Sequence, residues 1–270
     1  MIRPLALALA LLVPAALPLR AQTADQTTAQ TAADTAADAV LALFPAPAAA
    51  RRISVTVDKG LTRTASLPTA ALRQARRDML AGKVIADADL RALADRHDGR
   101  AAQDHVRRLL KAQDQTGTGT PSDIAFYGSI AVASGRIWTL PDAVRAMRVL
   151  DPATEPHARV SQYAAMLYPH AWAGNALALD ALIDLNGAGR LFGPMSEKTR
   201  ARVLAASRKA GDGRVALQMA MAALRDPADP AAARLWLTEA QAASHLGIRT
   251  AAAALLARLD ASPAPAAVTQ

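Results

Sequence analysis

The chain has 270 residues, a formal net charge of +8 and no cysteine. Without cysteine it forms no disulfide bond and carries no lipid on a cysteine at a cleavage site, so burial of apolar side chains must stabilise the fold. Hydrophobic residues make up 52% of the sequence, although aromatic residues make up only 3%. Abundant Ala, Leu and Arg with so few aromatic rings predict helices that pack closely through small side chains.

The positive charge is not gathered in one block. Acidic and apolar residues are interleaved with the arginines, among them Arg73, Arg76, Arg77, Arg107 and Arg108. A basic surface can attract acidic glycans, nucleic acid or anionic lipid. The interleaved pattern instead favours arginines on solvated helix faces, and we expect no nucleic-acid partner.

The first 21 residues have the three parts of a secretory signal peptide. Arg3 supplies a basic start, residues 4–19 are apolar, and Ala21 is the expected cleavage site. The apolar run is short and contains two prolines after its first residue, unlike an ordinary membrane span. An uncleaved membrane anchor is the alternative. We therefore predict a signal peptide at 1–21 and a mature protein in the periplasm or outside the cell, with no stable membrane span.

Two segments separate this signal from the helical body. Residues 22–50 are rich in Thr, Ala, Gln and Asp, which favours a disordered or weakly helical tether. In the segment 51–66, β-branched residues alternate with polar ones from Ile53 to Val57, and a turn-forming Asp-Lys-Gly follows. This pattern favours a short β-hairpin over 53–65, with irregular coil as the alternative. Because an isolated hairpin is marginal, we expect it to pack on the first helices or on a partner.

Residues 67–260 are predicted to form an all-α domain of about eleven short helices. Prolines, capping residues and glycines place these helices near 68–82, 90–94, 102–110, 121–133, 140–150, 156–167, 175–185, 196–209, 214–224, 230–244 and 251–259. Residues 113–120 are expected to form a flexible loop that subdivides the domain, and residues 261–270 a disordered tail. Short connections favour antiparallel helix pairs stacked as an α-solenoid, with a single compact bundle as the alternative.

The stretch from Gly211 to Leu259 carries a repeat. It is expected to form three helices, with Asp229 as an N-cap and Pro230 in the first helical position. The third helix repeats apolar positions of the first about 35 residues later, a period typical of helix-pair solenoids. The matched positions are Ala216, Ala220 and Leu224 with Ala251, Leu255 and Leu259.

The middle helix of this stretch resembles a Sel-one-like repeat, which is a tetratricopeptide-like helical repeat. The resemblance rests on Ala233, Trp236, Leu237, Ala240 and the Ser244-His245 turn. Partial matches occur at residues 125–147 and 93–102. The chain departs from the family pattern at Gln241 and Ser244, where the family has Ala and Gly, and at Gly247, which comes three residues late. Trp236 is expected to fill the core between helix pairs.

The resemblance implies a scaffold that binds other proteins of the cell envelope. Periplasmic members of the family regulate exopolysaccharide synthesis through a sensor kinase, and others assemble polysaccharide export machines. We therefore expect a non-catalytic periplasmic scaffold with protein partners, in regulation or assembly of an exopolysaccharide or envelope system. The alternative is a carbohydrate-binding protein or a glycan-active enzyme of the cell envelope.

The sequence contains no motif for catalysis or cofactor binding. It has no phosphate-binding Gly-rich loop, no HExxH and no GxSxG. A Gly-containing turn separates His97 from His105, so we predict no metal site there. Asp180 and Asp184 are one helical turn apart and are expected to lie on a solvated face, not to form a catalytic dyad. No catalytic residue, cofactor or metal is predicted.

One segment is a candidate for partner binding. Tyr168, His170 and Trp172 surround a proline in an expected connection between helices. Loops on repeat scaffolds often carry recognition, and exposed Tyr and Trp are favoured hot-spot residues. The alternative is that both rings cover the junction of neighbouring repeats. The sequence does not predict the oligomeric state.

Overall fold

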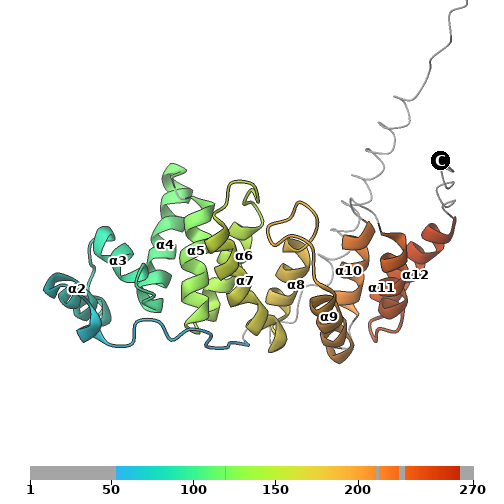
Figure 1. Ribbon diagram of the computed structural model, residues 1–270, viewed down its shortest axis with the longest axis horizontal. Helices are drawn as coiled ribbons and strands as arrows, with labels where there is room; N and C mark the ends of the chain where they lie inside the picture. Colours follow the sequence, from blue (N-terminus) through green and yellow to red (C-terminus); the bar gives the residue numbers. More distant parts are fainter. Residues whose placement is uncertain (1–52, 119, 211–212, 225–228, 262–270) are drawn as a thin grey trace, which may run out of the picture.

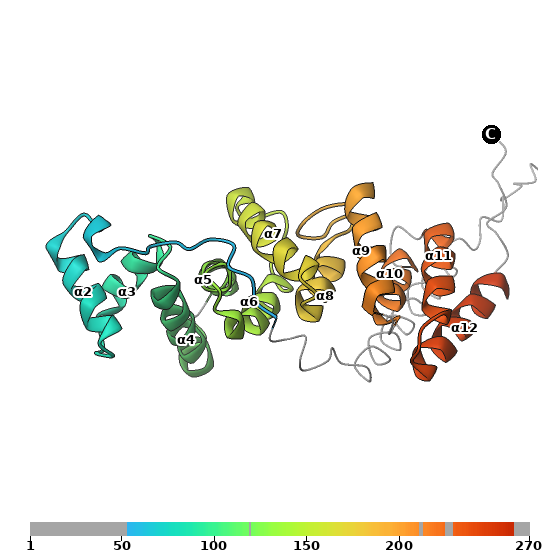
Figure 2. The same ribbon diagram turned by 90° about the horizontal axis from the view of Figure 1, so that it is seen from below.

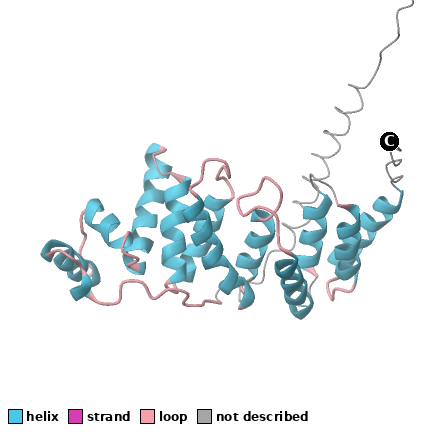
Figure 3. Ribbon diagram, in the orientation of Figure 1, coloured by secondary structure: helices cyan, strands magenta, loops and turns pink. Residues whose placement is uncertain are grey.

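The computed structural model describes residues 53–118, 120–210, 213–224 and 229–261, and this part of the chain is all-α. It contains eleven α-helices and two 3-10 helices, and no strand occurs within the described ranges (Figure 3). The predicted signal peptide, its cleavage site Ala21 and the tether lie outside these ranges, as does the tail after Ala261. The helices are η2 (Thr64–Ser66), α2 (Ala70–Leu80), α3 (Asp87–Ala94), α4 (Gly99–Thr116), α5 (Pro121–Ala133), η3 (Ile137–Thr139), α6 (Leu140–Met147), α7 (His157–Trp172), α8 (Ala176–Leu185), α9 (Glu197–Ala210), α10 (Arg214–Leu224), α11 (Pro230–Gln241) and α12 (Leu246–Ala261).

The helices follow one another along the long axis of the molecule in chain order, from α2 at one end to α12 at the other (Figures 1 and 2). Extensive contacts join helices that are adjacent in the chain, such as α4 with α5 and α10 with α11. Further contacts join helices that are next but one, as in α5 with α7 and α8 with α10. The main contacts between the described helices are therefore local in sequence.

Side chains that cap helix N-termini set most of the boundaries. The side-chain oxygens of Thr69, Asp98, Thr120 and Asn175 each accept a hydrogen bond from a backbone N–H in the first turn of the following helix. Such caps satisfy N–H groups that have no partner within the helix. The predicted cap Asp229 is confirmed, because its Oδ1 accepts from Ala232 N at 3.0 Å.

Small residues allow the helices to approach closely. Ala101, Ala125 and Ala143 are fully buried, and a Cβ placed on Gly128 of α5 would lie only 2.8 Å from the Ala143 Cβ of α6. A side chain at Gly128 would therefore separate the two helices. The core position predicted for Trp236 is confirmed, since only 1% of its surface is exposed.

The predicted β-hairpin at 53–65 is wrong. Residues 53–61, called the strap here, run as an extended segment along one side of the molecule, from the start of α8 back toward α2 (Figure 1). The strap donates hydrogen bonds to carbonyls at helix ends: Val57 N and Asp58 N donate to Ala133 O at 2.8 and 3.0 Å. The last carbonyls of a helix have no donor within the helix. They can therefore accept hydrogen bonds from the N–H groups of an extended segment, which takes the place of a partner strand.

The turn predicted at Asp58-Lys-Gly60 is present without the hairpin. Gly60 N donates to the Asp58 carboxylate at 2.8 Å, and Gly60 has a left-handed φ of 56°. A Cβ at Gly60 would lie 1.9 Å from the carbonyl oxygen of His97, so only glycine fits there. The turn directs the chain into η2 instead of into a second strand.

Two further boundaries differ from the prediction. The loop expected at 113–120 is shorter, because α4 continues to Thr116 and ends at Gly117, whose φ is 69°. The helix expected at 251–259 begins earlier, because α12 starts at Leu246 and contains Gly247 in its first turn. In both cases the helix is longer than predicted and includes residues that the prediction had assigned to a loop.

Candidate functional site

The candidate segment with Tyr168, His170 and Trp172 was expected in a connection between helices, and this expectation is wrong. It forms the last turn of α7, which continues through Pro169. Proline usually disturbs a helix interior by removing a hydrogen bond and by steric conflict with the preceding turn. Here the residues around the proline are buried, with Leu167 fully enclosed, so tertiary packing keeps the segment helical.

The two aromatic rings of this segment pack at a helix junction. Tyr168 and Trp172 are half-buried against the core, with ring centroids 5.7 Å apart. The guanidinium carbon of Arg202, on α9, lies 4.8 Å from the centroid of the Trp172 ring. A cation at this position is attracted by the ring face. One face of Trp172 is therefore already occupied by a neighbouring helix.

His170 is completely buried, and neither ring nitrogen has a hydrogen-bond partner. Burial lowers its pKa, and backbone groups of Val132 and Ile53 partly oppose this shift. The ring lies under the strap, where Asn175 Nδ2 donates to Ile53 O at 2.8 Å. The imidazole is therefore favoured in its neutral form within the core and is not accessible to a partner.

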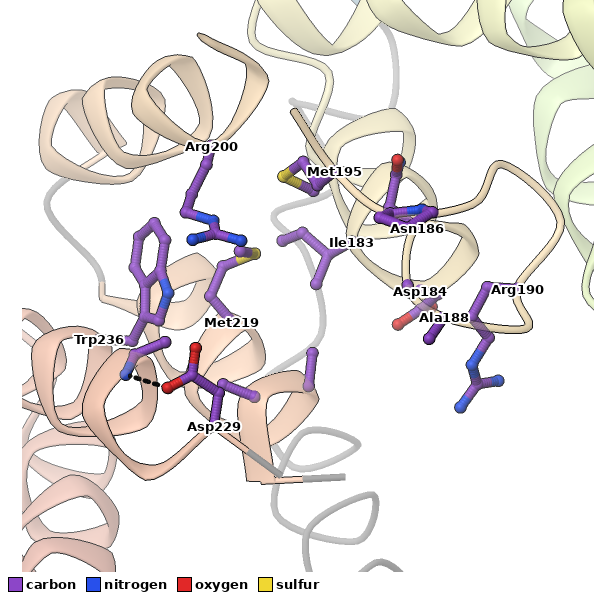
Figure 4. A pocket seen from close by; sticks show the side chains of 15 residues that line it. Ile183, Asp184, Asn186, Ala188, Arg190, Met195, Arg200, Met219, Asp229 and Trp236 are labelled. Carbon is purple, nitrogen blue, oxygen red and sulfur yellow. Dashed lines mark hydrogen bonds between the residues drawn. The ribbon is translucent and has the colours of Figure 1, made fainter. Parts of the chain in front are cut away.

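A groove of about 380 Å³ lies between α8, α9, α10 and α11. The connection between α8 and α9 forms one wall, and α10 with the start of α11 forms the other (Figure 4). Ile183, Met195 and Met219 supply apolar surface between these walls. The volume falls at the lower end of the roughly 300–1,000 Å³ that is typical of ligand sites.

Four charged side chains line this groove. Asp184 and Arg190 come from the side of α8 and its following connection, whereas Arg200 and Asp229 come from the side of α9 and α11 (Figure 4). Asp184 accepts a hydrogen bond from Arg148 at 2.5 Å, and Asp229 caps α11. Both carboxylates thus have structural partners within the described part of the chain.

The expectation that Asp180 and Asp184 share a solvated face is wrong for Asp180. Asp180 is buried with 4% of its surface exposed, and Arg214 of α10 donates a hydrogen bond to its carboxylate. Burial raises the pKa of Asp180, although Arg214 acts in the opposite direction. Helical spacing placed the two carboxylates on one side of α8, but α10 covers only the first of them.

No protein-family model, curated protein or solved structure matches this chain. The described residues contain no group of three or more His, Asp or Glu side chains arranged to bind a metal ion. Among the described helices, none has both the length and the apolar composition that crossing a membrane requires. The site must therefore be interpreted from its own geometry.

His97 and His105, the two histidines weighed for a metal site, each contact a different neighbour. His97 Nδ1 lies 3.0 Å from the Asp58 carboxylate on the strap. His105 is buried on α4 and packs edge-on against Tyr127, with ring centroids 4.6 Å apart. Each ring thus has a separate structural role.

Two surface features, the groove and the exposure of Trp138, could not be predicted from the sequence. The groove depends on how the connection after α8 packs against α9, α10 and α11, and this packing is not encoded in the periodicity of any one helix. Trp138, in η3, exposes 69% of its surface, although a large apolar residue just before a helix is usually expected to pack. Local patterns describe individual helices and carry no information about which surfaces the neighbours leave open.

Proposed function

We propose that this protein is a non-catalytic scaffold of the cell envelope, built as an α-solenoid of Sel-one-like or tetratricopeptide-like helix pairs. The observation that carries the proposal is the packing pattern: extensive helix contacts in the described residues reach only the next helix or the next but one. In a solenoid each repeat contacts mainly its neighbours, and the array presents a long surface for partners. The envelope location rests on the signal-like sequence of residues 1–21.

The groove supports protein binding better than catalysis. Its apolar lining includes the half-buried Met195, and a flexible thioether suits a surface that adapts to a partner. Its two carboxylates are already engaged, by Arg148 and by the start of α11. An envelope protein partner is therefore the expected ligand class.

The alternative of a carbohydrate-binding protein or glycan-active enzyme has weaker support. A glycan platform needs an open aromatic face beside the groove; Arg202 covers one face of Trp172, and Trp138, which exposes 69% of its surface, is not among the residues that line the groove. A glycosidase needs two carboxyl groups free to act as acid and base or nucleophile. Asp184 and Asp229 have other roles in the described structure.

The test is capture of partners from cells that export the protein. The full chain with a C-terminal affinity tag is cross-linked in the cells, purified from the envelope fraction and analysed by mass spectrometry. The scaffold proposal expects the same one or few envelope proteins in every replicate, and none of them with an unrelated exported protein carrying the same tag. Absence of any specific partner, or turnover of a glycan by the purified protein, contradicts the proposal.

A further inference from the structure

We infer that the groove between α8 and α11 binds an acidic protein segment with one apolar side chain between flanking carboxylates. The inference rests on the proposed scaffold function and names its binding surface and the chemistry of its partner. It follows from two properties of the groove, which are the charges that lack structural partners and the apolar surface between them.

The groove has one arginine without a described ionic partner, Arg190, and one that is paired only with a highly exposed carboxylate, Arg200. The Arg190 guanidinium is exposed and makes no hydrogen bond or ion pair in the described part of the chain. Arg200 Nη1 lies 3.2 Å from Glu197 Oε1, but 86% of the Glu197 side chain is exposed. An ion pair with so exposed a partner contributes little and is easily exchanged. Both arginines are therefore available to an external carboxylate.

The two negative charges of the groove are compensated. Asp184 is paired with Arg148 at 2.5 Å. Asp229 accepts from Ala232 N at the start of α11, where the partial positive charge of a helix N-terminus favours a carboxylate. The remaining charge of the groove is thus positive, and complementarity favours an acidic partner over a basic one.

The positions of the arginines specify how the acidic groups are arranged. Arg190 and Arg200 stand on opposite sides of the groove, with Ile183 between them and Met195 and Met219 on the Arg200 side of the lining (Figure 4). A ligand that satisfies both arginines must therefore cross this apolar surface. A peptide with a Leu or Met side chain at its centre and Asp or Glu on each side matches the arrangement.

The defined probe is a fluorescein-labelled nonapeptide with two glutamates on each side of a central leucine. One comparison peptide has lysines in place of the glutamates, and another has serine in place of the leucine. Binding to the full chain is measured by fluorescence polarisation at low salt and at high salt. We expect saturable binding of the acidic peptide that weakens as salt rises, and weaker binding of both comparison peptides.

The decisive variant is the double substitution Arg190→Glu with Arg200→Glu. Its matched control, Arg77→Glu with Arg96→Glu, changes the net charge equally at two exposed arginines of α2 and the end of α3. We expect the groove variant to lose about tenfold or more in affinity and the control to lose much less. Circular dichroism and the melting temperature establish that both variants are folded.

Three results overturn the inference. These are no saturable binding, equal binding of the acidic and lysine peptides, and equal affinity of the groove variant and wild type. The groove could instead be occupied by a second copy of this chain. A wild-type dimer that dissociates in the groove variant would show this and would also overturn the inference. If envelope proteins captured by the wild type are retained by the groove variant, the groove assignment fails while the scaffold proposal stands. If no partner is captured, the scaffold proposal itself fails.

Discussion

Two buried Arg–Asp pairs lie in different regions of the molecule and differ in the hydrogen bonds that surround the carboxylate. Near the N-terminal end, Arg76 of α2 donates to Asp98 at 2.7 Å, to Thr64 Oγ1 at 2.6 Å and to Leu61 O at 2.9 Å. The other oxygen of Asp98 caps α4 by accepting from two backbone N–H groups at 3.0 Å. This pair joins η2, α2 and α4.

The second pair, Asp180 with Arg214, lies between α8 and α10. Asp180 sits within the helix and caps nothing, and its burial raises its pKa despite Arg214. Removing charges from water costs several kcal/mol per ion unless geometry and further hydrogen bonds compensate. We therefore expect the carboxylate that also caps a helix to contribute more to stability than the one whose described hydrogen bond is to a single arginine.

The largest effect should follow Asp98→Ala. This change leaves Arg76 buried without its partner and removes the cap of α4, so we expect a loss of about 3–5 kcal/mol in the free energy of unfolding. Urea unfolding followed by circular dichroism measures it. Asp98→Asn is the control, because its side-chain oxygen can still accept from Arg100 N and Ala101 N. If both variants lose equally little, the N-terminal pair is not the stronger one.

A smaller effect is expected at the aromatic junction between the two regions. Tyr168→Ser combined with Trp172→Ser removes two half-buried rings and the contact with Arg202. We expect the melting temperature to fall by roughly 5–10 °C, since about 2–3 kcal/mol of packing is lost. An unchanged melting temperature with impaired partner capture would instead support the recognition role first predicted for this segment.

The C-terminal pair is tested by Asp180→Asn. Asn keeps an oxygen that can accept from Arg214, and Arg214 retains other interactions. We expect a cost of about 1–2 kcal/mol at pH 7, below the cost expected for Asp98→Ala. Because the folded pKa of Asp180 is raised, its protonation stabilises the fold below that pKa, and this contribution is lost as pH rises through it. A loss at Asp180 equal to that at Asp98 would remove the contrast between the regions.

The smallest effect, a change in pH dependence, concerns a buried group with no partner, His170. Its pKa is lowered in the folded state, so the unfolded chain binds the additional proton first as pH falls below about 6.5. Stability should decrease from pH 6.5 toward the folded pKa, and His170→Leu should decrease less. Urea midpoints at pH 7.5, 6.0 and 5.0 measure the difference between the two proteins.

Other ionisable groups around His170 remain unchanged in that comparison. Asp123 with Arg159, Asp180 with Arg214, and Asp184 with Arg148 are paired on the helices near α7, and Asp58 of the strap lies against His97. None of them contributes to the shift of the His170 pKa. His105, whose pKa is also lowered by burial, is present in both proteins. His157→Leu, at an exposed site, is the control; parallel pH curves for wild type and His170→Leu would contradict the prediction.

Much of the secondary structure could be predicted from local sequence. The helices at Pro121–Ala133 and Arg214–Leu224 have the expected bounds, and Ser196 caps α9 by accepting from Thr199 N at 3.2 Å. Pro in the first turn, a side-chain cap and apolar residues at helical spacing act within a few residues of one another. These signals are therefore present in the sequence without knowledge of distant contacts.

The tertiary structure decided the features that depend on distant partners. The alternating residues of the strap predicted a strand, but two of its N–H groups donate to a single carbonyl at the end of α5, Ala133 O. Pro169 looked like a helix end, but burial of its neighbours holds α7 together. Asp180 looked solvated until α10 covered it, and the groove exists only where four helices meet. Composition and spacing determine which helices form, whereas burial of a charge or an opening between helices depends on which segments pack together.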